Sequence, residues 1–302
     1  MIKRVILGAI FGVLFLVCCV AQLTGMTDGQ PTSVQLLVQL LSIALAAFAV
    51  SCFFPRKNKA EKSKRSYARL TKTNILTAIL VIIFAAVTVV FGMVFLQNRR
   101  YYLISVLIIL EVIAAFFAML EGRKPEAREL VTISVLCALA VAGRAAFYML
   151  PQFKATLAIV IIAGVCFGGE TGFLVGAVSA FVSNFFFGQG AWTPWQMFAS
   201  GVVGLLSGLV FANGKVPVTR VVLSVFGAVM AIVVHGIILN ASSVFLWQPE
   251  PTFEMLIASC ISGIPFDLIY GASTAMFLWF ISEPMIEKLE RLKTKYEILS
   301  RR

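Results

Sequence analysis

Long apolar runs separated by short polar turns recur along this chain, and they limit what it can fold into. A helix rises 1.5 Å per residue, so crossing a hydrocarbon layer of about 30 Å takes about 20 apolar residues. Hydrophobic residues make up 60% of the chain and charged residues only 13%. A soluble domain cannot bury so much apolar surface in a core of its own. The sequence therefore predicts an all-α integral membrane protein that has the lipid bilayer as its solvent.

We expect ten membrane-spanning helices, of which the sixth and seventh are the shortest. The turn GGETG at residues 168–172 separates these two, because its glycines favour a break between helices. The ten predicted spans lie near residues 5–23, 33–54, 75–97, 103–120, 130–149, 155–168, 172–187, 196–212, 221–246 and 255–281.

The positions of the basic residues predict the orientation, because Lys and Arg gather in cytoplasmic loops. With the N-terminus inside, 21 of the 25 Lys and Arg residues lie on the cytoplasmic side. An even number of spans returns the C-terminus to the same side, so both termini are predicted to be cytoplasmic. The net charge of +11 is then a consequence of topology, and we expect no nucleic-acid partner.

Composition divides the chain into three parts. Residues 1–124 hold four plain apolar helices and a basic cytoplasmic loop, and they are predicted to form an accessory membrane unit. Residues 125–283 hold six spans rich in Gly and Ala, with most of the polar residues that are expected at membrane depth. Residues 284–302 form a basic tail whose apolar spacing predicts an amphipathic helix on the membrane surface or against a partner. We expect function in the middle part.

Enzyme motifs are missing from the sequence: it has no HExxH, no GxSxG and no Walker A pattern. The single histidine, His235, lies inside an apolar run, and the six cysteines show no metal-ligand spacing. No nucleophile–base pair can be assembled, so we predict a protein that is not an enzyme and has no cofactor and no metal. If ATP drives transport, another subunit supplies the ATPase.

An uncharged aromatic stretch, FFFGQGAWTPWQMF at residues 185–198, is expected on the outer face. A belt of rings at the lipid headgroups would explain one or two of these aromatics. The interleaved Gly, Pro and Gln instead favour a fixed backbone path with flat apolar faces and orienting hydrogen bonds, which is the composition of a ligand site. The candidate substrate-binding residues here and at the next outer loop are Gln189, Trp192, Trp195, Gln196 and Trp247.

Other candidate binding residues are expected within the spans. Asp267 lies near the centre of the last span, where a carboxylate costs about 2.5–3.5 kcal/mol. It belongs either to a functional site or to an internal lock in which a neighbouring helix hydrogen-bonds it. Arg144, in the outer half of its span, could meet a carboxylate or phosphate, or extend outward to the surface. Asn184 and Asn240 complete the set, whereas Glu111 has no assigned role.

Small residues recur at four-residue spacing in two stretches, and such stripes let helices approach closely. The glycine stripe over residues 164–180 is expected to pack inside the chain. The alanine stripe of Ala138, Ala142 and Ala146 either packs internally or offers a smooth surface to another protein.

Residues of the middle part resemble the substrate-binding S component of an energy-coupling factor (ECF) vitamin transporter. The resemblance lies in GRAAF at 143–147, FLVGAVSAFVSNFFFGQGAWTPWQM at 173–197 and GIPFDLIYG at 263–271, and it covers about residues 128–283. It implies a six-helix protein of the prokaryotic cytoplasmic membrane that binds a vitamin from outside. It also implies, as partners, a transmembrane coupling protein and a pair of ATPases.

The same resemblance assigns roles to some of the residues. Ala138 and Ala142 match the family's Ala-xxx-Ala motif, which contacts the coupling protein, and Ala146 extends that motif. Outer loops and outer helix ends would form the substrate site, and ATP hydrolysis would tip the S component to release its ligand inside. Similar sequences suggest a corrinoid such as cobalamin as the ligand, but flavins and other ring compounds would suit the aromatic stretch too. The first four spans depart from the family.

Two functions of other classes stay open. A proton-coupled secondary transporter would rely on Asp267, Glu111 or His235, and its uptake would collapse with the proton gradient. A membrane scaffold that does not transport would use the basic loop and tail to hold a partner.

Overall fold

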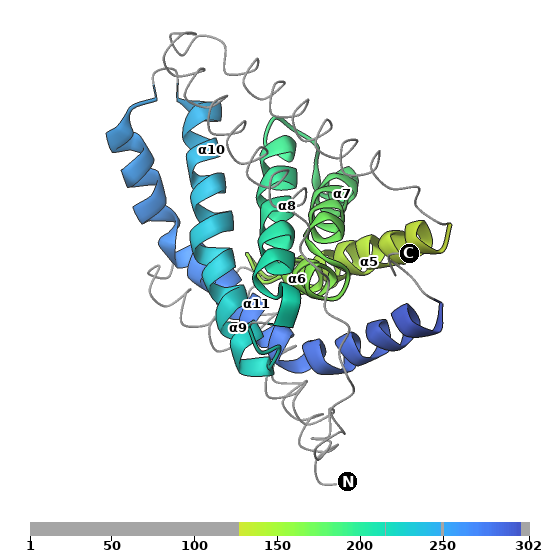
Figure 1. Ribbon diagram of the computed structural model, residues 1–302. Coiled ribbons are helices and arrows are strands. Elements are labelled where there is room, and N and C mark those ends of the chain that lie inside the picture. The colour runs from red at the N-terminus through yellow and green to blue at the C-terminus, as the bar shows by residue number, and fades with distance from the viewer. Residues whose placement is uncertain (1–126, 215, 249–250, 297–302) are drawn as a thin grey trace, which may run out of the picture.

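The computed structural model describes residues 127–214, 216–248 and 251–296, which Figure 1 draws as coloured ribbons. Within these ranges, helices are the regular secondary structure and no strand occurs. The first four predicted spans, Glu111 and the accessory unit at residues 1–124 lie outside the described residues, as does the very end of the tail.

Every predicted span from residue 130 onward has a helical counterpart, and the predicted ends agree with the observed ends to within a few residues for most of them. Among the described residues, three helical stretches are long and apolar enough to cross a membrane: Gly169–Phe187, Arg220–Trp247 and Phe253–Lys295. The helices are α5 (Ala127–Ala145), α6 (Thr156–Phe167), α7 (Gly169–Phe187), α8 (Thr193–Val210), α9 (Arg220–Val229), α10 (Ile237–Trp247) and α11 (Phe253–Lys295).

The predicted break between the sixth and seventh spans is confirmed at Gly168. Its φ of 99° lies in the region that favours glycine, and its N–H still donates to Gly164 O at 2.9 Å. The apolar run therefore divides into α6 and α7 instead of forming one long helix.

The glycine stripe packs inside the chain, as predicted. A Cβ added at Gly172 would lie 2.3 Å from the carbonyl oxygen of Gly204, and one added at Gly176 would lie 2.3 Å from that of Ser200. These distances are shorter than any van der Waals contact, so α7 and α8 touch backbone to backbone along this line. Gly164 makes the same kind of approach from α6 to Gly204.

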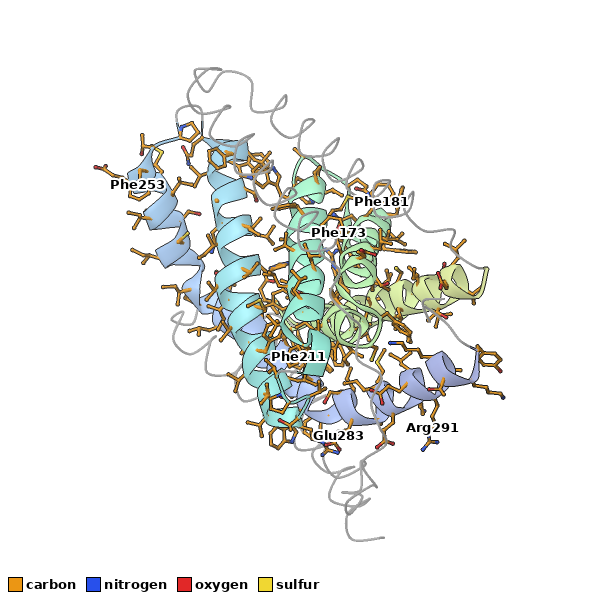
Figure 2. The ribbon with its side chains drawn as sticks, viewed as in Figure 1. Phe173, Phe181, Phe211, Phe253, Glu283 and Arg291 are labelled. Carbon is orange, nitrogen blue, oxygen red and sulfur yellow. The ribbon has the colours of Figure 1, made fainter. Side chains whose placement is uncertain are left out.

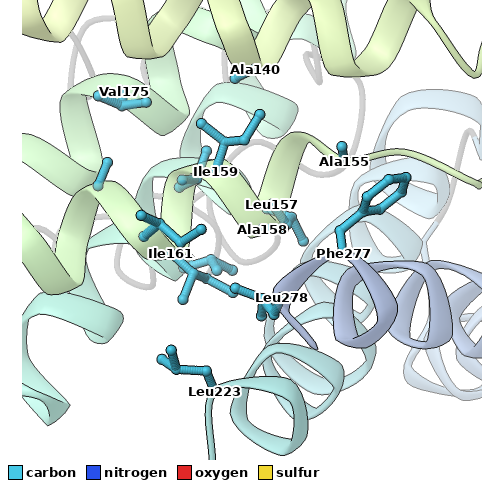
Figure 3. Packing of buried hydrophobic residues seen from close by; sticks show 14 of the residues in the cluster. Ala140, Ala155, Leu157, Ala158, Ile159, Ile161, Val175, Leu223, Phe277 and Leu278 are labelled. Carbon is cyan, nitrogen blue, oxygen red and sulfur yellow. The ribbon is translucent and has the colours of Figure 1, made fainter. Parts of the chain in front are cut away.

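The core is built around α6, which is apolar on all sides. Eleven of its 12 residues are buried, which is expected of a helix that other helices surround. Figure 3 shows Ile161 of α6 close to Leu278 of α11, and Leu223 of α9 belongs to the same cluster. The cluster also contains Leu136 of α5 and Leu289 of α11, so it joins the two ends of the described chain.

The ninth predicted span forms one continuous stretch in which a π-helical segment, Met230–Gly236, links α9 to α10. Segments with this wider winding often occur at functional sites. His235 lies in the segment, is buried, and meets the ring of Tyr270 edge-on, with ring centroids 4.9 Å apart.

The last helix, α11, runs for 43 residues and contains Pro265 and Pro284. Proline removes a backbone hydrogen bond and bends a helix. Figure 2 shows Phe253 at one end of a bent path that runs down to Glu283 and then turns toward Arg291. The tail therefore continues α11 to Lys295, and its apolar residues Ile286 and Leu289 are buried in the chain's own core.

Candidate functional site

A polar network joins the ends of α5, α7 and α8 and is centred on Arg144. The Arg144 Nη1 donates to Ser183 Oγ at 2.5 Å and to Asn184 Oδ1 at 2.8 Å. The guanidinium also lies over the ring of Phe187, with 4.8 Å from Cζ to the centroid, and Tyr148 stacks on the same ring. Two neutral oxygens and an aromatic face thus fix one side of this cation.

Asn184 extends the network to α8. It is buried, and its Nδ2 donates to Thr193 Oγ1 and to Gln196 Oε1, each at 2.9 Å. The amide therefore uses its oxygen for Arg144 and its nitrogen for α8, which fixes its orientation. Three candidate residues named from the sequence, Arg144, Asn184 and Gln196, are brought together here.

The loop between α7 and α8 is held by its own polar side chains. Gln189 Nε2 donates to Phe181 O at 3.0 Å, and Thr193 Oγ1 donates to Gln189 Oε1 at 2.9 Å. Gly188 has a φ of 101°, and a Cβ at Gly190 would lie 2.5 Å from the ring of Trp192. The backbone conformation of the loop therefore requires glycine at position 188, and Gly190 leaves room for the Trp192 ring.

The three candidate tryptophans have different surroundings. Trp195 belongs to α8, is buried, and stacks on Phe245 with centroids 6.0 Å apart. Trp192 covers Gly190 and is partly exposed, and Trp247, at the end of α10, is 69% exposed. They do not form one continuous aromatic surface. The indole Nε1 of Trp195 is buried and has no hydrogen-bond partner among the described residues.

A second network joins α10 and α11 around Asp267. Asn240 Nδ2 donates to Asp267 Oδ2 at 2.8 Å, and Ser259 Oγ donates to Asn240 O at 3.0 Å. A Cβ at Gly236 would lie 2.6 Å from the Asp267 carboxyl carbon, so the carboxylate rests against the α10 backbone. Asp267 therefore has the hydrogen bond from a neighbouring helix that an internal lock requires.

The sequence reasoning missed a group of residues on the loop between α5 and α6. Lys154 Nζ lies 5.5 Å from the ring centroid of Tyr270 and donates to Gln152 Oε1 at 3.1 Å. Burial and, to a smaller extent, the positive charge of Arg144 lower the pKa of Lys154 to about 8. One signal was available, because Lys154 is one of the few basic residues predicted for the outer half.

The alanine stripe is exposed: Ala138 and Ala142 lie on α5, Ala146 directly follows the helix, and all three are exposed. Apolar neighbours on the same helix, Val135 and Leu139, are also about half exposed. Within the described part of the chain, this face of α5 is free of covering helices, so it is available to lipid or to another protein.

Comparison with known proteins gives a family and several relatives for this chain. The chain matches the family described as "ECF-type riboflavin transporter, S component" over residues 124–279, which is just over half of its length. It is 34% identical over 88 residues to a UPF0397 protein of Vibrio atlanticus (strain LGP32), and 33% identical over 88 residues to UPF0397 proteins of Aliivibrio fischeri (strain MJ11) and Aliivibrio salmonicida (strain LFI1238).

Each of these three alignments covers 28% of this chain, and the chain spans about half the length (48%) of the curated relatives it matches. No solved structure matches the chain. The family match covers all of α5 to α10 and most of α11, including both polar networks. The chain therefore belongs to the S-component family of ECF-type riboflavin transporters, and it is a multi-pass membrane protein.

Proposed function

We propose that this chain is the substrate-binding subunit of an ECF-type importer and that it captures a flavin, or a vitamin with a similar ring system, from outside the cell. The description of the matching family names riboflavin, and this favours a flavin over cobalamin. The cobalamin prediction from the sequence stays open and is tested beside the flavin below.

The observation that carries this proposal is the network around Arg144 and Asn184. It fixes a cation and an amide at the meeting point of three helix ends, next to the aromatic side chains of Phe187 and Tyr148. Ligand sites for ring compounds combine aromatic walls with a few polar groups of fixed direction. The groups are positioned before any ligand arrives, which reduces the entropy that binding costs.

Trp195 adds a second reason to place the ligand near this network. Its buried indole N–H lacks an acceptor in the described residues, and an unpaired buried donor costs about 1–3 kcal/mol. Gln196, the next residue, belongs to the network itself. A carbonyl or ring nitrogen of a flavin would supply the missing acceptor. Gln189, Trp192, Asn240, Trp247 and Asp267 stay predicted contributors to the site.

The partners that we propose are a transmembrane coupling protein and a pair of ATPases. This chain contains no Walker A motif, so ATP hydrolysis must come from other subunits. The exposed alanine stripe of Ala138, Ala142 and Ala146 offers the coupling protein a smooth helix face, on which small side chains allow close approach.

A binding titration tests the ligand and its position together. Purified protein in detergent is titrated with riboflavin and with cobalamin while its tryptophan fluorescence is recorded, with a correction for absorption by the ligands. We expect saturable quenching by riboflavin. Asn184→Ala should weaken the affinity about tenfold, because it removes the amide that accepts from Arg144 and donates to α8.

The control is Ser262→Ala, because the Ser262 hydroxyl is exposed and bonds within its own helix to Ser259 O. Its affinity for riboflavin should equal that of the wild type. Saturable binding of cobalamin and not of riboflavin would replace the proposed ligand. The absence of saturable binding to either, with protein shown to be folded, would contradict the proposed function.

A further inference from the structure

Arg144 and Lys154 are two cations that the fold holds close together. Ala155 N donates to Gly143 O at 3.4 Å, so the backbones next to Lys154 and Arg144 are in contact. The charge of Arg144 also lies near enough to lower the pKa of Lys154. Two like charges in a partly buried place repel one another more strongly than they would in water.

The loop that carries Lys154 is fixed firmly to the rest of the bundle. Phe153 is fully buried and packs against Phe147 and Phe277, with ring centroids 5.2 and 5.3 Å apart. Ser273 Oγ donates to the backbone oxygen of Lys154 at 3.5 Å. The backbone at Lys154 therefore cannot move away from Arg144 without disturbing the core.

Neither cation has an anionic partner in the ranges that the structure describes. The hydrogen bonds of Arg144 go to a serine and an amide, and that of Lys154 goes to an amide. The carboxylate of Asp267 accepts a hydrogen bond from Asn240, and Glu283 forms an ion pair with Arg220 that joins α9 to α11. Within the described residues, Arg144 donates hydrogen bonds only through Nη1, so its other nitrogens can donate to a ligand.

From this arrangement we infer that the ligand carries an anionic group, a phosphate or a carboxylate, which binds between Arg144 and Lys154. The inference rests on the proposed function and narrows its substrate class from flavins in general to anionic flavins. Guanidinium and ammonium groups recognise such oxygens with short, charge-assisted hydrogen bonds. The aromatic ring of the ligand would then lie toward Phe187, on whose face Arg144 is already held.

A pair of flavins tests the inference directly, because riboflavin and riboflavin 5′-phosphate share one ring system and differ in charge. Both are titrated against the full chain in nanodiscs of phosphatidylcholine, with flavin fluorescence as the signal. We expect wild-type protein to bind the phosphate at least tenfold more tightly. Lys154→Gln should weaken binding of the phosphate about tenfold and leave that of riboflavin within twofold, whereas Lys154→Arg should retain the preference.

Lys288→Gln is the matched control, because Lys288 is an exposed lysine of α11 between Glu283 and Arg291, which Figure 2 places far from Phe181. It should leave both affinities unchanged. Equal binding of the two flavins by the wild type would overturn the inference and leave the proposed function standing. Equal weakening of both flavins in Lys154→Gln would overturn it as well, because it would show a role in folding.

The pH dependence of the wild type is a second measurement that needs no variant. Lys154 loses its charge as pH rises through about 8, so affinity for the phosphate should fall between pH 7 and pH 9 while affinity for riboflavin stays level. The other charged or titratable groups near Lys154 are Arg144 on α5, His235 in the π-helical segment and Tyr270 on α11. A preference for the phosphate that is constant over this range would contradict the role of Lys154.

Two further outcomes would also overturn the inference. If nanodiscs that contain phosphatidylglycerol abolish the preference for the phosphate, a lipid headgroup occupies the pair of cations and the inference is overturned. If neither flavin binds to folded protein, the proposed function fails and the inference fails with it.

Discussion

Replacing Gly172 with alanine should force α7 and α8 apart. The added Cβ would lie 2.3 Å from the carbonyl oxygen of Gly204 and 2.8 Å from the Cα of Gly164. A carbon and a carbonyl oxygen in contact lie about 3.3–3.6 Å apart. Both neighbours are backbone atoms that cannot rotate away, so the helices must separate by about 1 Å.

The size of the effect follows from two opposing terms. Overpacking a tight interior costs about 1–3 kcal/mol, and the upper part of that range applies because three helices meet at this point. Alanine has a helix propensity about 0.8–1.0 kcal/mol better than that of glycine, which offsets part of the cost. We expect a net loss of about 2 kcal/mol, which is about 4–8 °C in Tm for a domain of this size.

The separation should also reach the candidate site. The bonds of Asn184 to Thr193 and Gln196 join the same two helices at 2.9 Å, and a shift of about 1 Å takes them beyond hydrogen-bond distance. Gly172→Ala should therefore lower flavin affinity as well as Tm.

Thermal unfolding in detergent, followed by size-exclusion chromatography of the soluble fraction, measures the change in Tm. Gly143→Ala is the matched comparison, because its Cβ would come no closer than 3.0 Å to its nearest neighbour, Ala155 Cβ, whereas that of Gly172→Ala would lie 2.3 Å from a carbonyl oxygen. The loss of Tm should be clearly smaller for Gly143→Ala. A Gly172→Ala protein that unfolds within 1 °C of the wild type would refute the close backbone contact between α7 and α8.

Three further predictions concern the site and its partners. Thr193→Val removes one of the two acceptors of Asn184 and should weaken flavin binding about tenfold in the fluorescence titration, whereas unchanged affinity would exclude the network from the site. Asp267→Asn keeps an oxygen that accepts from Asn240, so ATP-driven uptake should persist; loss of uptake with intact ligand binding would instead favour proton coupling through this residue. Ala142→Trp should prevent copurification with the coupling protein and leave flavin affinity unchanged, and retained copurification would exclude this face of α5 as the contact.

Helix positions in the second half of the chain could be predicted because lipid imposes a minimum length on each apolar run. The glycines of the GGETG turn predicted the break at Gly168, and the four-residue spacing of glycines predicted the close contact of α7 with α8. The bent path of α11 was harder to predict. The sequence predicted a separate tail at residues 284–302, whereas α11 continues through Pro284 to Lys295 and buries Ile286 and Leu289 in the core.

Part of the candidate site could also be predicted, because some of its residues are close together in the sequence. Asn184, Gln189 and Gln196 stand close together in one uncharged stretch, so the sequence itself brought them to one loop and its flanking helix ends. Lys154 lies 116 residues before Tyr270 along the chain, and its position depends on how α6 packs against α11. No local pattern encodes a contact of that kind. The burial of Trp195 on Phe245 likewise depends on the packing of α8 against α10.

Uptake of radiolabelled riboflavin tests the central claim most directly. The measurement uses cells that cannot make riboflavin and that express this chain with an ECF coupling protein and ATPase pair, with an ionophore present to collapse the proton gradient. We predict uptake that continues with the ionophore and stops when the lysine of the ATPases' Walker A motif is replaced. Uptake by this chain alone that disappears with the proton gradient would contradict the account and identify a secondary transporter.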